Sequence, residues 1–125
     1  MLTIDLDTSL KAAMGIDGAI CVAIVDCTSC MALGSASALP SVDPSIVAAA
    51  GTEVLRAKLR AMEILGVHDV VEDIMILLGQ QYHLLHPLPD RTGAGLLVYL
   101  VLDRSRANLA LAHHQLRAIS DELEI

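Results

Sequence analysis

Two cysteines three residues apart are the first feature of this sequence that suggests chemistry. Cys27 and Cys30 enclose the sequence C-T-S-C, a spacing found in zinc sites and in thiol-disulfide exchange. A zinc site needs two further ligands, and a redox pair usually lies at a helix start, where amides and dipole lower the thiol pKa. This pair falls in an expected turn between strands. Buried or incidental thiols are therefore favoured, with metal or redox chemistry as the alternative.

Four of the five histidines form two close pairs that look like metal ligands. His83 and His86 lie three residues apart in an expected strand, so their side chains point to opposite faces and cannot share a metal. His113 and His114 are adjacent in an expected helix, about 100° apart around its axis, and are poorly placed to chelate. Structural or surface roles are favoured for all four.

Five carboxylates fall at the ends of expected strands and turns. Paired carboxylates can perform acid–base catalysis, but no nucleophile, phosphate-binding loop or third partner accompanies them in the sequence. We therefore expect solvated strand ends, no catalytic residue, no metal, no cofactor and no enzyme activity. These carboxylates are Asp17, Asp26, Glu72, Asp73 and Asp103.

Length and composition predict a single domain, residues 1–125, with an apolar excess. Hydrophobic residues make up 54% of the 125 residues and charged residues 18%, whereas charged residues are nearer a quarter of a typical soluble domain. Part of this excess is expected at an interface. The net charge of −7 disfavours nucleic acid and anionic lipid, and the absence of Phe and Trp removes the usual base-stacking platforms.

Location is inferred from three features of the sequence. The N-terminal M-L-T-I-D-L-D is acidic where a signal peptide is basic. The longest uncharged apolar stretch, 94–102, is under half of the roughly twenty residues of a membrane helix. Three cysteines without framework spacing indicate reduced thiols. We expect a cytoplasmic protein without membrane insertion.

Apolar periodicity and capping residues predict three helices and five strands. A first helix ends near Met14, before Gly15, and a last helix begins with a cap at Ser105 and buries one apolar stripe. Strands 19–25, 70–78 and 96–102 are apolar on both parities, so helices should cover both faces of the sheet. The remaining elements are strands 31–34 and 81–87, loops 35–43 and 90–95, and a helix over 44–65.

The helix over 44–65 carries the second informative pattern. Asp43 can cap it, Pro44 fits its first position and Gly66 ends it. Its apolar residues form two neighbouring stripes, which predicts two contacts, one with the sheet of the same chain and one with another chain. The stripes are Val47, Ala50, Val54, Ala57, Ala61 and Ile64, and Ala48, Leu55, Leu59 and Met62.

This helix also holds the candidate interface. Gly51 follows three alanines and predicts a close helix crossing, because glycine in a helix interior costs about 1 kcal/mol relative to alanine. Arg56, Lys58, Arg60 and Glu63 line the helix. Of these, Arg56, Arg60 and Glu63 share one face, and this polar strip suits an acidic partner surface. The alternatives are a helix buried over a broad arc and a plain solvated face. The candidate dimer or partner residues are Ala48, Gly51, Leu55, Arg56, Leu59, Arg60 and Met62.

The order of these elements, and the residues within them, resemble the roadblock family, named from dynein light chains, whose bacterial members regulate Ras-like GTPases. The resemblance covers nearly the whole chain. It rests on I-D-G-A-I-C-V-A-I-V-D, on the alanine-rich helix, on E-D-I-M-I-L-L-G-Q-Q-Y-H-L-L and on L-V-L-D-R-S-R-A-N-L-A-L-A. Two positions depart from the family pattern: Cys30 replaces a common hairpin glycine, and His113 replaces a common arginine.

The resemblance implies an α/β fold with three α-β-α layers around a mostly antiparallel five-stranded sheet, in the order α-β-β-α-β-β-β-α. It also implies a homodimer with a continuous sheet and adjacent second helices. The implied function is a non-catalytic regulator or scaffold that binds a small Ras-like GTPase or a larger complex, and that either promotes GTP hydrolysis or only tethers the partner. The alternative is a small-molecule or metal/redox-responsive sensor on the same fold, which needs an internal cavity.

Overall fold

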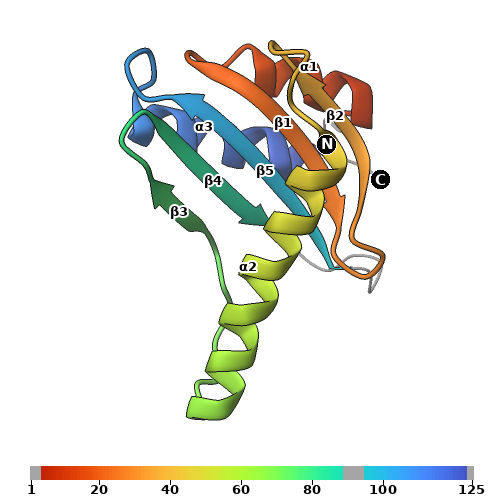
Figure 1. The fold of residues 1–125 in the computed structure, drawn as a ribbon, viewed down its shortest axis with the longest axis vertical. Helices are drawn as coiled ribbons and strands as arrows, with labels where there is room; N and C mark the ends of the chain where they lie inside the picture. The colour runs from red at the N-terminus through yellow and green to blue at the C-terminus, as the bar shows by residue number, and fades with distance from the viewer. Residues whose placement is uncertain (1–3, 89–94, 124–125) are drawn as a thin grey trace.

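A computed structural model describes residues 4–88 and 95–123, and these residues form three layers (Figure 1). One antiparallel sheet of five strands lies between α2 on one face and α1 with α3 on the other. This confirms the predicted fold class and element order. The elements are α1 (Leu6–Met14), β1 (Ala19–Asp26), β2 (Met31–Ser37), α2 (Pro44–Leu65), β3 (Ile74–Leu77), β4 (Gln81–Pro87), β5 (Leu96–Asp103) and α3 (Leu109–Glu122).

The centre of the sheet is formed by the two strands with the most continuous apolar sequence. The strand order is β2-β1-β5-β4-β3, and β1 pairs with β5 over most of its length. Alternate residues of β1 enter two different cores: Val22 and Ile24 pack toward α1 and α3, whereas Ala23 and Val25 pack toward α2. Both faces are covered, as the apolar runs on both parities predicted.

The predicted strand 70–78 is wrong in length and in burial. β3 spans only Ile74–Leu77 and lies at the edge of the sheet, and its residues alternate between half-buried and exposed. Met75 and Leu77 are exposed, and Val70, which lies before the strand, is 77% exposed. The apolar run 70–78 predicted a strand covered on both faces. The described part of the chain covers β3 only in part.

Two other boundaries also differ from the prediction. β2 continues to Ser37, where loop 35–43 was expected, because Ser35 and Ser37 pair with β1 in the ladder. α3 begins at Leu109 and is capped by Asn108, whose side chain accepts from the Leu111 amide. Ser105 is not the cap, since its amide and hydroxyl donate to the carboxylate of Asp103 in the preceding turn. Most of the predicted loop 90–95 lies outside the described residues, as does Pro89.

The predicted ends of the first two helices are confirmed. α1 ends at Met14, with Gly15 as its C-cap. The Asp43 side chain accepts from the Ser45 amide at the start of α2, and Gly66 ends the helix with a φ of +70°, a conformation that glycine adopts without a Cβ penalty. Among the described helices, none has the length and apolar character required to cross a membrane.

The burial of α2 changes along its length rather than between two stripes. Ala48, Gly51, Thr52 and Leu55 are buried against the sheet, whereas every residue from 56 onward is exposed or half-buried. Twenty-two residues make a helix of about 33 Å, while the eight residues of a central strand extend about 26 Å. The second half of α2 therefore projects beyond the sheet (Figure 1).

Gly51 makes a close approach, but to a strand of its own chain and not to another helix. A Cβ placed on Gly51 would lie 2.7 Å from Cδ2 of Tyr99 and 3.2 Å from Cδ2 of Leu97, both on β5. The distance to Tyr99 is shorter than any normal contact between carbon atoms. The predicted helix crossing is therefore wrong, and the close approach is between α2 and β5. The absent side chain allows the Tyr99 ring to lie directly under the helix.

The turn between β1 and β2 contains backbone strain at the position where the family resemblance predicted a replaced glycine. Cys30 has a φ of +61°, and it is the one non-glycine residue with positive φ among residues 4–88 and 95–123. Such a conformation costs a non-glycine residue about 1–2 kcal/mol. Cysteine in place of glycine at position 30 therefore strains the turn, while β1 and β2 still pair as a hairpin.

We expect Gly51→Ala to destabilise the protein by about 1–3 kcal/mol, because the added methyl group overpacks the contact with Tyr99. The gain in helix propensity of about 1 kcal/mol would not compensate for this. The measurement is the free energy of unfolding from urea denaturation. The control is Ala50→Gly at the adjacent exposed position, which should lose about 1 kcal/mol. A Gly51→Ala variant as stable as the parent protein would contradict the close contact.

Candidate functional site

The most distinctive surface of the protein is apolar and lies on the projecting end of α2 and on β3. Eight of the thirteen exposed large hydrophobic side chains among the described residues fall between positions 59 and 78. Isolated exposed apolar residues are normal, whereas a concentration of them in one part of a chain points to an interaction site. We call this group the 59–78 surface. It comprises Leu59, Ile64, Leu65, Val67, Val70, Met75, Leu77 and Leu78.

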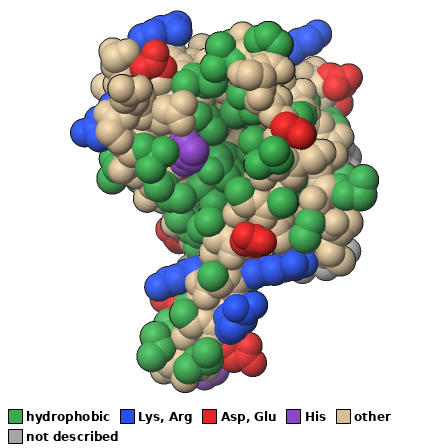
Figure 2. All heavy atoms as spheres, in the orientation of Figure 1, with side chains coloured by type: hydrophobic (Ala, Val, Ile, Leu, Met, Phe, Trp, Pro, Cys, Tyr) green, Lys and Arg blue, Asp and Glu red, His purple; other side chains and the backbone are tan. Residues whose placement is uncertain are grey.

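Polar side chains border this surface at the point where α2 leaves the body of the protein. Lys58 and Arg60 are exposed on this part of the helix. In Figure 2, basic side chains gather at the narrow region above the projecting tip, and hydrophobic side chains are visible on the tip itself. The arrangement is an apolar end with a basic margin, in a chain whose net charge is −7.

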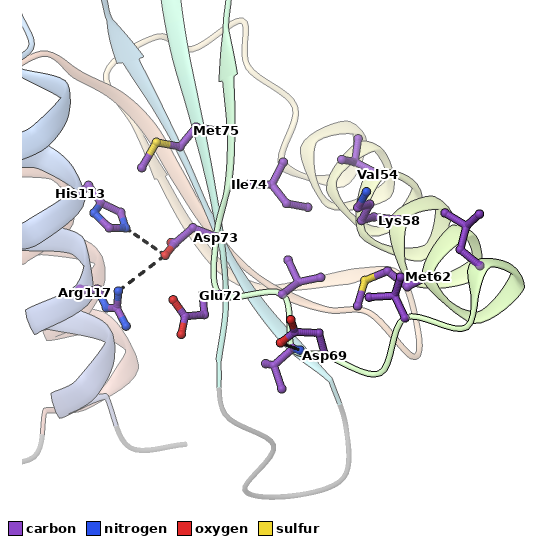
Figure 3. Close-up of a pocket in the computed structure, with 14 residues that line it drawn as sticks. Val54, Lys58, Met62, Asp69, Glu72, Asp73, Ile74, Met75, His113 and Arg117 are labelled. Carbon is purple, nitrogen blue, oxygen red and sulfur yellow. Dashed lines mark hydrogen bonds and ion pairs between the residues drawn. The ribbon is translucent and has the colours of Figure 1, made fainter.

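An open groove of about 1150 Å³ runs beside β3 and joins this region to α3. Figure 3 shows the segment that leads into β3 between the two helices, with Val54, Lys58 and Met62 on the α2 side and His113 and Arg117 on the α3 side. The groove is lined mainly by apolar atoms near α2 and by charged side chains near α3. Leu65, Val67, Val70 and Met75 of the 59–78 surface line part of the groove.

The structure divides the seven candidate interface residues into buried and exposed members. Ala48, Gly51 and Leu55 are buried under the α2 face of their own sheet, which corrects their placement on an interface, because another chain cannot reach them. Leu59 and Arg60 are exposed, and Met62 is half-buried in the groove wall. These last three remain candidates for contact with another chain.

Arg56, the seventh candidate, binds the turn between β1 and β2. Its guanidinium donates to the backbone oxygen of Cys27 and lies 3.6 Å from Sγ of Cys30. These bonds hold the strained turn against α2. Although its side chain is exposed, Arg56 has a structural role within the chain that the sequence did not indicate.

The two cysteines of the C-T-S-C sequence differ in their surroundings. Cys27 is buried and Cys30 is half-buried. Burial raises the pKa of the Cys27 thiol above its usual range, which suppresses the reactive thiolate. The part of the chain that the structure describes contains no group of three or more His, Cys, Asp or Glu residues that could hold a metal ion.

His83 and His86 point to opposite faces of the sheet, as the parity of a strand predicts. On the α2 face, Nδ1 of His83 lies 2.6 Å from the Tyr99 hydroxyl, and Nε2 lies 2.9 Å from Oε1 of Gln81. Burial lowers the pKa of His83 and raises the pKa of Tyr99. Both groups are therefore held in their neutral forms, which suits a structural role.

On the opposite face, Asp73 connects three elements of the fold. Its Oδ1 lies 2.8 Å from Nδ1 of His86 on β4, and its Oδ2 lies 2.9 Å from Nε2 of His113 on α3. Arg117 of α3 lies 4.0 Å from the same Oδ2. Figure 3 shows Asp73 pointing toward α3, with dashed lines to His113 and Arg117. We call Asp73, His86 and His113 the Asp73 cluster.

This cluster was not predicted from the sequence, although the pairing of Asp73 with His86 follows from the register of the hairpin. In the β3–β4 hairpin the numbers of paired residues add up to 159, as in Ile74 with Leu85 and Leu77 with Tyr82. Continuing this register by one residue places Asp73 opposite His86. The contribution of His113 depends on how α3 packs on the sheet, and no local pattern indicates that packing.

No protein-family model and no curated protein matches this sequence. Solved structures do match. MglB from Myxococcus xanthus has a TM-score of 0.74 and 16% identity, covering 92% of this chain and 78% of that one. A Roadblock/LC7 domain from Streptomyces avermitilis has a TM-score of 0.76 and 13% identity, covering 94% and 93%.

The chain has the roadblock/LC7 fold. A third match, described as MglB with tetrameric arrangement, has a TM-score of 0.75 and 15% identity, covering 92% of this chain and 82% of that one. Because the identities are low, these matches establish the fold and not the activity. The likeness to roadblock/LC7 domains agrees with the family resemblance that the sequence motifs suggested.

We expect Cys30 to be alkylated under native conditions at least tenfold faster than Cys27, because Cys27 is buried and its thiol pKa is raised. The measurement is the rate of iodoacetamide modification at each cysteine by peptide mass spectrometry. Unfolded protein is the control, in which the two rates should become similar. Equal native rates, or zinc bound stoichiometrically to protein purified without chelator, would instead support the metal or redox interpretation.

Proposed function

We propose that the protein is a homodimeric, non-catalytic regulator or scaffold of the roadblock type, and that the dimer binds a small Ras-like GTPase. The single observation that carries the dimer is the concentration of exposed apolar side chains at positions 59–78 beside an unpaired sheet edge. The GTPase partner is carried by the resemblance and by the roadblock/LC7 fold.

The edge strand β3 supplies the backbone part of the proposed interface. An exposed edge presents unpaired amides and carbonyls that can pair with another strand. Among residues 4–88 and 95–123, β3 has β4 on one side and no strand on the other. Antiparallel pairing of β3 with its copy satisfies two-fold symmetry, in which the same patch is used on both subunits. The two sheets would then form one continuous sheet.

The projecting half of α2 supplies the hydrophobic part. A two-fold axis perpendicular to the sheet keeps both copies of α2 on the same face and brings their free ends toward the shared edge. Ile64 is 77% and Leu65 is 74% exposed, and burying such side chains contributes about 1.5–3 kcal/mol each. A second copy would therefore cover side chains that this chain cannot cover by itself.

The chemistry of the described residues supports a regulator more than a sensor. A ligand sensor usually encloses its ligand in a cavity with convergent polar groups. The groove beside β3 is open, and it adjoins the apolar residues assigned to the dimer. A second copy would close it. The basic margin formed by Lys58 and Arg60 remains beside the interface and is complementary to an acidic partner surface.

The dimer is tested by sedimentation equilibrium of the full chain. We expect a dimer, and we expect Leu65→Glu to raise its dissociation constant by at least a hundredfold, because the charge would be buried in an apolar contact. Leu111→Glu on α3 is the matched control, since Leu111 is also exposed but lies outside the 59–78 surface. The proposal fails if the parent protein is monomeric throughout, or if both variants weaken association equally.

The partner is tested by affinity capture from native lysate in GDP and in GTP, followed by assays with the purified partner. We expect a Ras-like GTPase whose GTP hydrolysis is accelerated or whose GTP-bound form is preferentially retained. Arg60→Glu should weaken binding about tenfold by removing charge complementarity. Lys11→Glu, an exposed position on α1, is the matched control. Failure of every nucleotide state to retain a GTPase would contradict this function.

A further inference from the structure

We infer that the β2 edge is a second surface for self-association, at which residues 33–39 of two copies pair as antiparallel strands about a two-fold axis at Ala36. This goes beyond the proposed dimer, which uses β3 at the opposite edge of the sheet (Figure 1). Among residues 4–88 and 95–123, β2 has β1 on one side and no strand on the other. Such an edge presents amides and carbonyls to another strand.

Exposed apolar side chains lie at this edge as well as at the other. Of the thirteen exposed large hydrophobic residues that the structure describes, eight belong to the 59–78 surface and four of the other five lie between positions 31 and 46. These four are Met31, Leu33, Leu39 and Ile46. Val42, Pro44 and Val47 line a recess together with Ser35 and Ser37. The start of α2 therefore adjoins the β2 edge.

β2 has few of the features that protect an edge strand from pairing. Natural proteins place charged residues, lysine above all, or proline on such strands. Met31–Ser37 contains neither a charged residue nor a proline. A bulge opposite Ile24 and Val25 interrupts the strand near the β1–β2 turn, and bulges hinder pairing. Residues 34–37 nevertheless pair with β1 in one unbroken register, so this end of β2 is free to receive another strand.

The pairing with β1 determines which backbone groups of β2 face outward. In an antiparallel ladder, pairs of residues that exchange hydrogen bonds alternate with pairs that do not. The amide of Ala38 donates to the carbonyl of Ile20, and the same register continues along the two strands. Ala36 therefore directs its amide and carbonyl toward β1. The amides and carbonyls of Ser35 and Ser37 point the other way, to the free edge.

The sequence around Ala36 is nearly palindromic. Residues 33–39 read L-G-S-A-S-A-L, so a strand aligned antiparallel with its own copy about Ala36 places like residues opposite like residues. Leu33 then lies opposite Leu39 of the second copy, and Ser35 lies opposite Ser37. The small central side chains allow close approach, the leucines contact each other at both ends, and no charge meets a like charge.

The backbone pattern and the sequence symmetry favour the same register. Pairing about Ala36 joins Ser35 of each copy to Ser37 of the other through about four backbone hydrogen bonds, two for each pair. A shift by one residue would set Ser35 opposite Ala38, whose amide already donates to β1. An edge that matches its own reversed sequence fits a second copy of this chain better than a strand of different sequence.

Only the effect on larger assemblies rests on the proposed function. If β3 is the dimer edge, pairing at β2 extends the continuous sheet from two subunits to four or more. The β2 contact is short and its central side chains are small, so it buries less apolar area than the 59–78 surface. We therefore expect it to be the weaker association, which appears at higher protein concentration.

Disulfide trapping tests the register in the full chain, with oxidised glutathione as the oxidant and Cys30→Ser removing the half-buried native thiol. Ala36→Cys would face its own copy with Cα atoms about 4.5 Å apart, within the range that a disulfide requires. Ala38→Cys is the matched control, because the two copies of residue 38 would lie about 13 Å apart. We expect Ala36→Cys to form covalent dimers at least tenfold faster, although Ala38 is the more exposed residue.

Sedimentation equilibrium separates the two edges. Leu65→Glu is designed to remove the association at the 59–78 surface, and we expect a weaker dimer to remain at high concentration. Adding Ser35→Lys should raise the dissociation constant of this dimer at least tenfold, because lysine on an edge strand opposes pairing and two copies enter one interface. Ser29→Lys, at an exposed position of the β1–β2 turn, is the matched control and should leave the constant unchanged.

The inference is overturned if Ala36→Cys and Ala38→Cys form covalent dimers at equal rates, or if Leu65→Glu stays monomeric up to millimolar concentration. If Leu65→Glu abolishes all association, the proposed dimer is retained and the inference is rejected. If Ser35→Lys abolishes association and Leu65→Glu does not change it, the inference is retained and the proposed dimer is rejected.

Discussion

The structure depends on how far α2 can cover the sheet. In its first half, small residues let the helix lie close to β5, and the contact between Gly51 and the Tyr99 ring fixes the distance between the two layers. In its second half, the helix extends past the strands and has no sheet beneath it (Figure 1). The first half of α2 therefore belongs to the core, and its second half presents exposed apolar side chains.

This partial coverage explains where the apolar excess of the composition lies. β1 and β5 are buried on both faces, and their aliphatic side chains fill the two cores. Most of the exposed large apolar residues that the structure describes lie at positions 59–78, on the end of α2 and along β3. β3 is also the strand with the least support, and the Asp73 cluster ties it to β4 and α3. The Asp73 cluster therefore lies next to the 59–78 surface.

The sequence predicted the fold well because its elements are marked by local signals. Asp43, Pro44 and Gly66 define α2 to the residue, and the apolar runs identify β1 and β5 as central strands. Features that depend on packing were less accessible. The burial of β3 and the role of Gly51 depend on where α2 lies, and the cap at Asn108 in place of Ser105 depends on which acceptor Ser105 finds in the turn.

The candidate site could be predicted only in part, for the same reason. Periodicity identified α2 as the helix with surplus apolar residues, but it placed the division between two stripes, whereas the structure places it along the helix axis. Leu59 and Met62 remain candidates, while Ala48 and Leu55 are core residues. Arg56 binds a strained turn nearly thirty residues earlier in the sequence, and no local pattern reveals such a contact.

The proposed two-fold interface joins the end of α2 and the β3 edge of one copy to those of a second copy. Isotope-filtered NMR on a mixture of labelled and unlabelled full chains tests it most directly, because only contacts between copies are detected. We expect contacts between copies from the methyl groups of Ile64, Leu65 and Leu77. Contacts confined to the β2 edge, or a chain that stays monomeric at millimolar concentration, would contradict it.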